Sequence, residues 1–224
     1  MKTIFAFLYT ALVRVNLVAQ TNLPVPINIK AAFDKGTRDM NGKPGKNYWQ
    51  NTAVYDIAVN FEPATRVITG TEVINYTNNS PDTLTEIVFK LYPNIYKKGS
   101  SRLMNISGED VTEGVSIEKM SAAGVLLNES NYRIDATNMT VRMKPLLPKS
   151  SVTFSISYSY TLNKKSHIRT GEIEAGAYFI AYFFPRIAVY DDIDGWNRNP
   201  YLGTHEFYND FCDFNLAITV PADY

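Results

Sequence analysis

Residues 152–160 read VTFSISYSY, and this stretch decides the fold class. Apolar and small hydroxyl side chains alternate along it. The apolar ones are Val152, Phe154, Ile156, Tyr158 and Tyr160. Because successive side chains of a β-strand point to opposite faces, the pattern predicts a strand with one buried and one solvated face. Strands of this kind are typical of antiparallel sheets.

The same period of two, or short apolar runs between turn residues, recurs along most of the chain. We expect further strands at residues 55–61, 67–76, 87–91, 115–120, 125–127, 132–134, 139–143, 177–184 and 212–220. No segment of helical length shows a convincing helical period. The sequence therefore predicts an all-β fold, an antiparallel β-sandwich with little helix.

Three local features of these strands are also predicted. Gly70 indicates a bulge or bend, which an isolated glycine inside a strand often marks. The almost continuously apolar run 177–184 predicts a strand buried on both faces. Cys212 falls on the inward face of the last strand, which predicts an inert, buried thiol.

The N-terminal region predicts export of the protein. Lys2 is followed by an apolar run at residues 4–13 and by a tolerable cleavage site at 17–19, so residues 1–19 are interpreted as a signal peptide, with Arg14 as its unfavourable feature. No later stretch is apolar enough to span a bilayer. Residues 20–51, rich in proline and glycine, predict an extended leader, and residues 52–224 the β-sandwich domain. The expected location is periplasmic, cell-surface or secreted.

Composition excludes several classes of protein. The chain has 22 Lys and Arg against 22 Asp and Glu, so it lacks the excess positive charge typical of nucleic-acid-binding proteins. One cysteine excludes an internal disulfide framework. With His167 and His205 as the only imidazoles, a three-histidine metal site is impossible.

The short motifs predict no catalytic and no metal-binding residue in this chain. His205 and Glu206 begin a zincin-like motif, but Asn209 stands where the second histidine is needed. The loop with Asp191, Asp192 and Asp194 is interpreted as a solvated turn, with an irregular calcium site as the alternative. His167 is expected to be an exposed, uncommitted imidazole. Paired carboxylates of a glycosidase remain open, because the fold positions them and not the sequence spacing.

Two stretches resemble a known domain. The first stretch, residues 55–94, contains a glycine, an isoleucine, a tyrosine, an asparagine and a serine in that order. The second, residues 177–224, contains the blocks F-P, W-N, E-F-Y and I-T-V-P in that order. These positions are Gly70, Ile74, Tyr76, Asn78, Ser80, Phe184, Pro185, Trp196, Asn197, Glu206, Phe207, Tyr208, Ile218, Thr219, Val220 and Pro221. Together they resemble the saddle-like N-terminal β domain of the gluzincin zinc aminopeptidases, the membrane alanyl aminopeptidase family, and are most similar to its exported bacterial members.

The resemblance implies that the chemistry lies in a domain after this one. In the family, G-x-M-E-N, HExxH with a distant Glu, and a Tyr follow the β domain, and zinc activates a water for peptide hydrolysis. Because these motifs do not occur before Tyr224, we expect a domain cut off at its C-terminal boundary. No cofactor is expected in this chain, no activity from it alone, and zinc is implied for the full-length protein.

The resemblance also implies partners and positions for some residues. The partners are the protein's own C-terminal catalytic domain and a peptide substrate, with no nucleic acid. Family members place one Gln or Glu near the substrate α-ammonium, and Glu174 is the candidate here; Arg186, Trp196 and Tyr201 are candidates for the domain interface. The expected function is to brace the catalytic domain and shape its peptide cleft. The alternative is a free-standing carbohydrate- or protein-binding sandwich, which the aromatic content favours.

Overall fold

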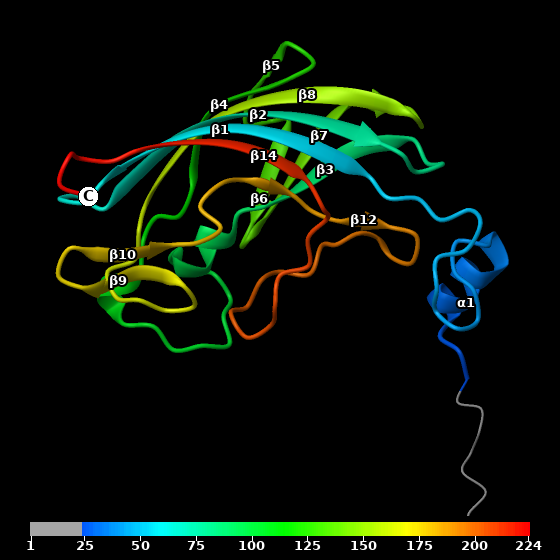
Figure 1. The fold of residues 1–224 in the computed structure, drawn as a ribbon, viewed down its shortest axis with the longest axis horizontal. Coiled ribbons are helices and arrows are strands. Elements are labelled where there is room, and N and C mark those ends of the chain that lie inside the picture. Colours follow the sequence, from blue (N-terminus) through cyan, green and yellow to red (C-terminus); the bar gives the residue numbers. More distant parts are fainter. Residues whose placement is uncertain (1–23) are drawn as a thin grey trace, which may run out of the picture.

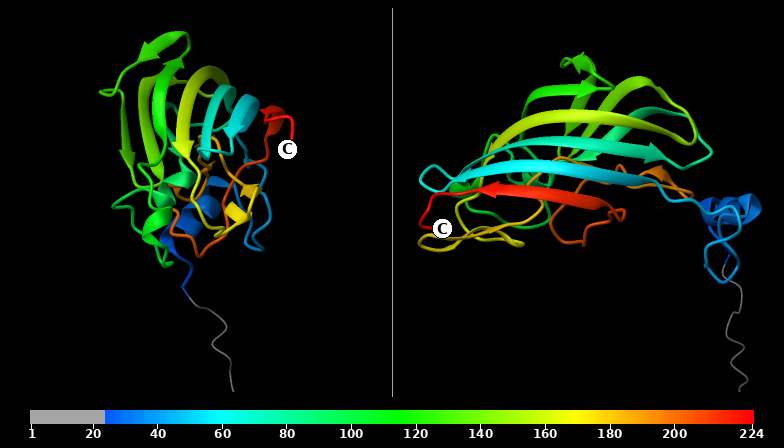
Figure 2. Two further views of the ribbon diagram at one scale, coloured as in Figure 1. Left: turned by 90° about the vertical axis from the view of Figure 1, so that its left-hand side faces the viewer. Right: turned by 45° about the horizontal axis from the view of Figure 1, so that its top comes forward.

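The computed structural model describes residues 24–224, and its core lies between two sheets. The larger sheet has six strands in the order β14-β1-β2-β8-β4-β5, and the smaller has four in the order β11-β3-β7-β6. Figure 1 shows the larger sheet arching over the rest of the molecule, and the right-hand view of Figure 2 shows its curvature. This confirms the predicted all-β sandwich.

The strands follow the alternation of the sequence closely. The larger sheet comprises β1 (Thr52–Glu62), β2 (Val67–Asn78), β4 (Ser116–Ala122), β5 (Val125–Leu127), β8 (Ser150–Thr161) and β14 (Asp213–Thr219), and the smaller β3 (Leu84–Lys90), β6 (Tyr132–Asp135), β7 (Asn138–Leu146) and β11 (Arg186–Ile187). Two hairpins, β9 (Thr170–Glu174) with β10 (Ala177–Ile180) and β12 (Tyr190–Asp191) with β13 (Gly195–Trp196), lie beneath the arch (Figure 1).

The inward side chains of both sheets form one core. Phe89 on β3 and Phe154 on β8 are fully buried, and their rings meet edge to face at 5.3 Å. Phe154 belongs to the apolar face of residues 152–160, and the serines between point outward. The predicted one-sided strand is therefore confirmed, and it is the central link between the sheets.

β14 is the exception to the antiparallel pattern. It pairs in parallel with β1, while every other strand pair in residues 24–224 is antiparallel. Its second edge carries no strand in the described part of the chain. All seven residues of β14 are exposed. Cys212, just before it, packs against the core as predicted but is only half-buried, so the prediction of a fully buried thiol is wrong.

The leader predicted at residues 20–51 is not extended throughout. Residues Ile27–Lys35 form helix α1, which ends at Gly36 with a left-handed φ of 69°. The amide of Gly36 donates a hydrogen bond to the carbonyl of Phe33, and Ala32 is buried. The glycines and prolines predicted a chain without packed structure, but one of these glycines ends the helix. The signal peptide predicted at residues 1–19 lies outside the described residues.

Two further expectations about strands need correction. Gly70 lies in an unbroken register with both β1 and β8, so it forms no bulge, and the alternative of a bend stays a prediction. Residues 177–184 are not buried on both faces: β10 pairs only with β9, and Phe179 is exposed. In addition, no helix within residues 24–224 is long and apolar enough to cross a bilayer.

Candidate functional site

A cluster of aromatic rings lies apart from the main core. Phe207 is at its centre, with ring centroids 4.5 Å from Tyr92, 4.7 Å from Tyr182 and 4.7 Å from Tyr201. Tyr92 begins the 3₁₀ helix η1 (Tyr92–Tyr96), and the other three rings come from loops. The edge-to-face and tilted arrangements are those that the charge distribution of aromatic rings favours. The cluster thus holds together segments that are distant in sequence.

A hollow of about 260 Å³ opens beside this cluster. Its lining consists of Tyr92, Arg169, Ala181, Tyr182, Phe184, Arg186, Phe207 and Asn209. The lining therefore carries two guanidinium groups and no carboxylate. We call this hollow the arginine pocket.

Arg186, on β11, is held in place from two sides. Its Nη2 donates a hydrogen bond of 2.7 Å to the backbone oxygen of Asp210, and the guanidinium lies 5.3 Å from the ring centroid of Phe214. Its Nε is buried and has no hydrogen-bond partner in the described residues. Burial raises the pKa of the Asp210 carboxyl to about 6, although a hydrogen bond from Gln50 and the charge of Arg186 oppose the rise. Burial likewise raises the pKa of Tyr92 to about 12, again against Arg186.

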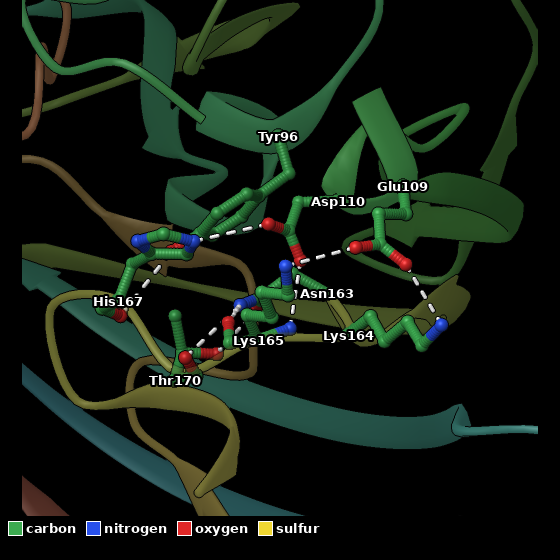
Figure 3. Close-up of polar contacts among 8 residues, drawn as sticks. All are labelled: Tyr96, Glu109, Asp110, Asn163, Lys164, Lys165, His167 and Thr170. Atoms are coloured by element: carbon green, nitrogen blue, oxygen red, sulfur yellow. Dashed lines mark hydrogen bonds and ion pairs between the residues drawn. The ribbon is translucent and has the colours of Figure 1, made fainter. Parts of the chain in front are cut away.

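Arg169 lines the pocket from a loop that a buried carboxylate fixes. Figure 3 shows the contacts of this carboxylate, Asp110, with residues 165 and 167 of the loop. Asp110, at the end of η2 (Gly108–Asp110), has a fully buried side chain. Its Oδ1 accepts the backbone N–H of Lys165 at 2.7 Å, and its Oδ2 lies 3.0 Å from Nε2 of His167. His167 is therefore committed to Asp110, and the expectation of an uncommitted imidazole is wrong.

Neighbouring charges reinforce this attachment. Glu109, on η2, forms ion pairs with two lysines of the loop, Lys164 at 2.8 Å and Lys165 at 2.9 Å (Figure 3). The two lysines lower the pKa of the Glu109 carboxyl to about 2. Pairs as exposed as these contribute little to stability, so Asp110 is the main fixing point.

The backbone near the pocket is strained. Ile168, Arg169 and Tyr182 have φ angles of 46°, 64° and 43°. Such left-handed conformations cost roughly 1–3 kcal/mol each and persist only where the surroundings enforce them. Tyr182 donates its hydroxyl to the carbonyl of Ile168, and Tyr96 donates to the carbonyl of His167 at 3.2 Å. These contacts hold Arg169 and Tyr182 at the pocket.

The residues singled out from the sequence lie in three places. Arg186 lines the pocket, and Tyr201 lies in the adjoining cluster, 5.4 Å from Tyr92. Trp196 packs instead against Tyr190 on the β12–β13 hairpin. Glu174 ends β9 as an exposed side chain and lines neither the pocket nor the cluster, so its substrate-binding role stays a prediction.

Four polar or charged pocket residues were missed in the sequence: Tyr92, Arg169, Tyr182 and Asn209. Tyr182 and Asn209 adjoin the F-P and E-F-Y blocks, so proximity to those blocks was the available signal. No signal in the sequence marked Arg169, because the position of its loop depends on Asp110, more than fifty residues earlier in the chain.

A second hollow, of about 670 Å³, lies between the N-terminal segment and the turns of the sandwich. Trp49 and Tyr190 stack in its wall with ring centroids 5.6 Å apart. Asp192, also in the wall, is buried and pairs with Arg38 at 2.8 Å. The interpretation of the loop that carries Asp192 as a solvated turn is therefore wrong for Asp192, whereas Asp194 is exposed in the turn as expected.

The described residues do not fit a zinc site. No group of three or more His, Cys, Asp or Glu side chains in residues 24–224 is arranged to hold a metal ion. Asp191 accepts the backbone N–H groups of Ile193 and Asp194, at 3.0 and 2.8 Å. Nε2 of His167 is engaged by Asp110, and His205 is exposed, with its Nδ1 3.2 Å from the hydroxyl of Thr204. No step of zinc chemistry can be derived from this part of the chain.

Comparison with known proteins finds similar solved structures only. No protein-family model and no curated protein sequence matches the chain. An M1 zinc metallopeptidase from Deinococcus radiodurans is 17% identical over 80% of this chain and 34% of that chain, with a TM-score of 0.47. A two-domain M1 zinc metallopeptidase mutant bound to L-arginine is 17% identical over 81% of this chain and 35% of that chain, with a TM-score of 0.46.

Aminopeptidase A from Legionella pneumophila, in complex with aspartic acid, is 8% identical over 52% of this chain and 11% of that chain, with a TM-score of 0.33. The two structures described before it are M1 zinc metallopeptidases by name. The chain spans about a third of the length of the Deinococcus enzyme.

Proposed function

We propose that the chain is the non-catalytic N-terminal domain of an exported zinc aminopeptidase. It braces a C-terminal catalytic domain and shapes the cleft that receives the peptide. The ordered sequence blocks in residues 55–94 and 177–224 suggest the family. The observation that carries the bracing role is an apolar surface on β14.

This surface, which we call the β14 row, consists of Phe214, Leu216, Ile218 and Val220. Their exposed fractions are 43%, 49%, 61% and 38%. Phe214 stacks on the buried ring of Tyr55 at 5.0 Å, so the row lies on the same side of the sheet as the core. Alternate residues of a strand share one face, and Asn215 on the other face bonds to Asp56.

The β14 row thus continues the apolar face of the larger sheet beyond the part that the described chain covers. Phe211, two residues before the strand, is also 87% exposed. A contiguous apolar surface of this kind marks a contact with another protein surface. In this proposal the occupant is the catalytic domain of the same polypeptide.

The Ile218→Asp variant tests whether the β14 row is a free contact surface. Because Ile218 is exposed, the variant should keep the free energy of unfolding within about 0.5 kcal/mol of wild type. It should also weaken binding of a separately produced catalytic domain, measured by sedimentation velocity over a range of concentrations. The matched control is Ile57→Asp on the paired strand β1, which should unfold the protein because Ile57 is buried. Unfolding of the Ile218 variant would contradict the proposal.

The second hollow favours one other candidate, a carbohydrate-binding module. Trp49 and Tyr190 provide stacked rings in the wall of a 670 Å³ hollow that also contains Asn79 and Lys149. Aromatic walls with amide and charged groups are typical of small-ligand sites. Oligosaccharide binding on a glycan array that is lost in Trp49→Ala would favour this candidate, and its absence would eliminate it.

A further inference from the structure

The arginine pocket has a charge that the protein as a whole lacks. The chain has formal net charge +0, yet this pocket is lined by Arg169 and Arg186 and by no acidic residue. Glu206 pairs with Arg169 and the Asp210 carboxyl lies near Arg186, but neither of these acidic residues is in the lining. The lining therefore indicates an anionic ligand.

Arg186 has donors left for such a ligand. A guanidinium carries five N–H donors in a planar fork. In the described residues Arg186 uses one of them, on the backbone oxygen of Asp210, and its buried Nε is unpartnered. A planar fork of donors matches a carboxylate, which it can bind through two parallel hydrogen bonds.

Two other groups add donors from different sides of the pocket. Arg169 pairs with Glu206 at 3.3 Å, but both side chains are largely exposed, so a ligand can compete for the guanidinium. Tyr92 donates its hydroxyl to Oδ1 of Asn209 at 3.0 Å, and that leaves the amide nitrogen of Asn209 as a donor.

The remaining wall is apolar and sets the size of the ligand. Tyr92, Tyr182, Phe184 and Phe207 supply aromatic surface. The volume of about 260 Å³ is below the range of roughly 300–1,000 Å³ found for drug-sized ligands. The pocket therefore suits a carboxylate carried on one apolar or aromatic group, about the size of an amino-acid residue.

The backbone supports this interpretation independently. Arg169 and Tyr182, both in the lining, have positive φ angles, and Asp110 and Tyr96 hold the loop that carries Arg169. Strained backbone that is held by its surroundings is found at sites arranged in advance for a ligand.

We propose that the arginine pocket is a binding site for the carboxylate of an apolar or aromatic acid, with Arg186 and Arg169 on the carboxylate and Tyr92, Tyr182 and Phe207 around the apolar group. The site is complete within this chain, so it does not depend on the proposed aminopeptidase role. The acid is either a small free acid or the C-terminal residue of a peptide, since both present the same group.

The test is isothermal titration calorimetry of the full chain with N-acetyl-L-phenylalanine. We expect N-acetyl-L-phenylalanine to bind saturably. N-acetyl-L-phenylalaninamide, which lacks the carboxylate, and acetate, which lacks the ring, should each bind at least tenfold more weakly than this acid. Gly-Gly-Phe as acid and amide forms the second arm. Binding of the tripeptide acid as well assigns a peptide C-terminus, whereas binding of N-acetyl-L-phenylalanine alone assigns a small free acid.

Variants locate the binding in the pocket. Arg186→Gln should weaken binding at least tenfold and Arg169→Gln by about threefold to tenfold. Arg133→Gln, an exposed arginine on β6, should leave binding unchanged. The Arg186→Gln variant also loses the contact with Asp210. If it unfolds for that reason, the Arg169→Gln variant, together with the comparison of acid and amide on the wild-type chain, decides whether the pocket binds the carboxylate. Absence of saturable binding, or equal binding of acid and amide, overturns the proposal.

Discussion

Replacing Glu72 by leucine should stabilise the protein, and the gain should grow as the pH rises. Glu72 is on β2 and its side chain points into the core, where it is 2% exposed. Neither carboxyl oxygen has a hydrogen-bond partner in the described residues. A buried polar group without a partner costs about 1–3 kcal/mol, so we expect Glu72→Leu to gain about that much at pH 5.

The pH dependence follows from the proton that Glu72 holds. Burial raises the pKa of the Glu72 carboxyl well above its ordinary value of 4.5. Above pH 4.5 the unfolded chain loses this proton while the native protein keeps it, so the native state binds more protons. The stability of the wild type must then fall as the pH rises toward the raised pKa, by up to about 1.4 kcal/mol per pH unit. A variant without the carboxyl escapes this loss.

Urea denaturation at pH 5, 7 and 9 measures the effect. Glu72→Gln keeps the shape but cannot ionise, so its stability relative to wild type should rise across the series, as for leucine. Asp210, whose pKa burial raises to about 6, titrates in both proteins and cancels in the difference. Glu118→Gln on β4, an exposed position, is the control and should stay within about 0.5 kcal/mol of wild type. A constant difference between wild type and Glu72→Gln would contradict the account.

Gly70→Ala should destabilise the protein by about 2–3 kcal/mol, although alanine is the more rigid residue. The side chain of Tyr158 on β8 lies directly over Gly70. A Cβ at position 70 would lie 2.6 Å from Cε1 of Tyr158 and closer still to Cζ and the hydroxyl oxygen. Tyr158 is 1% exposed and cannot move away, so the strain falls on the core.

A double-mutant cycle isolates this contact. In a Tyr158→Leu background the clash is absent, so Gly70→Ala should cost almost nothing and the coupling energy should be about 2 kcal/mol. Gly108→Ala is the matched control, since its Cβ would meet no atom within 4 Å. Equal effects of Gly70→Ala in both backgrounds, measured by urea denaturation, would contradict the role assigned to Gly70.

The sequence predicts most of the sandwich because burial there follows a period of two. In β1 exposed and buried residues alternate strictly, and in β2 and β8 buried residues alternate with exposed or partly buried ones over most of the strand. The predicted strands agree with these three within a few residues. The same rule was wrong for β14. Its alternate apolar residues are exposed, because the period shows which residues share a face and not what covers that face.

Residues that meet only in the folded chain were beyond prediction from the sequence. The arginine pocket combines residue 92, residue 169, residues 181–186 and residues 207–209. His167 and Asp110 are 57 residues apart, and nothing in the local sequence links them. Helix α1 was missed because it is only nine residues long, between prolines and glycines.

The central claim is that this chain is one domain of a longer zinc aminopeptidase. Sequencing the gene through and beyond the codon for Tyr224 tests it most directly. The account predicts an open reading frame that continues into an H-E-x-x-H motif with a more distant glutamate. A stop codon directly after Tyr224, or a continuing frame without that motif, would contradict it.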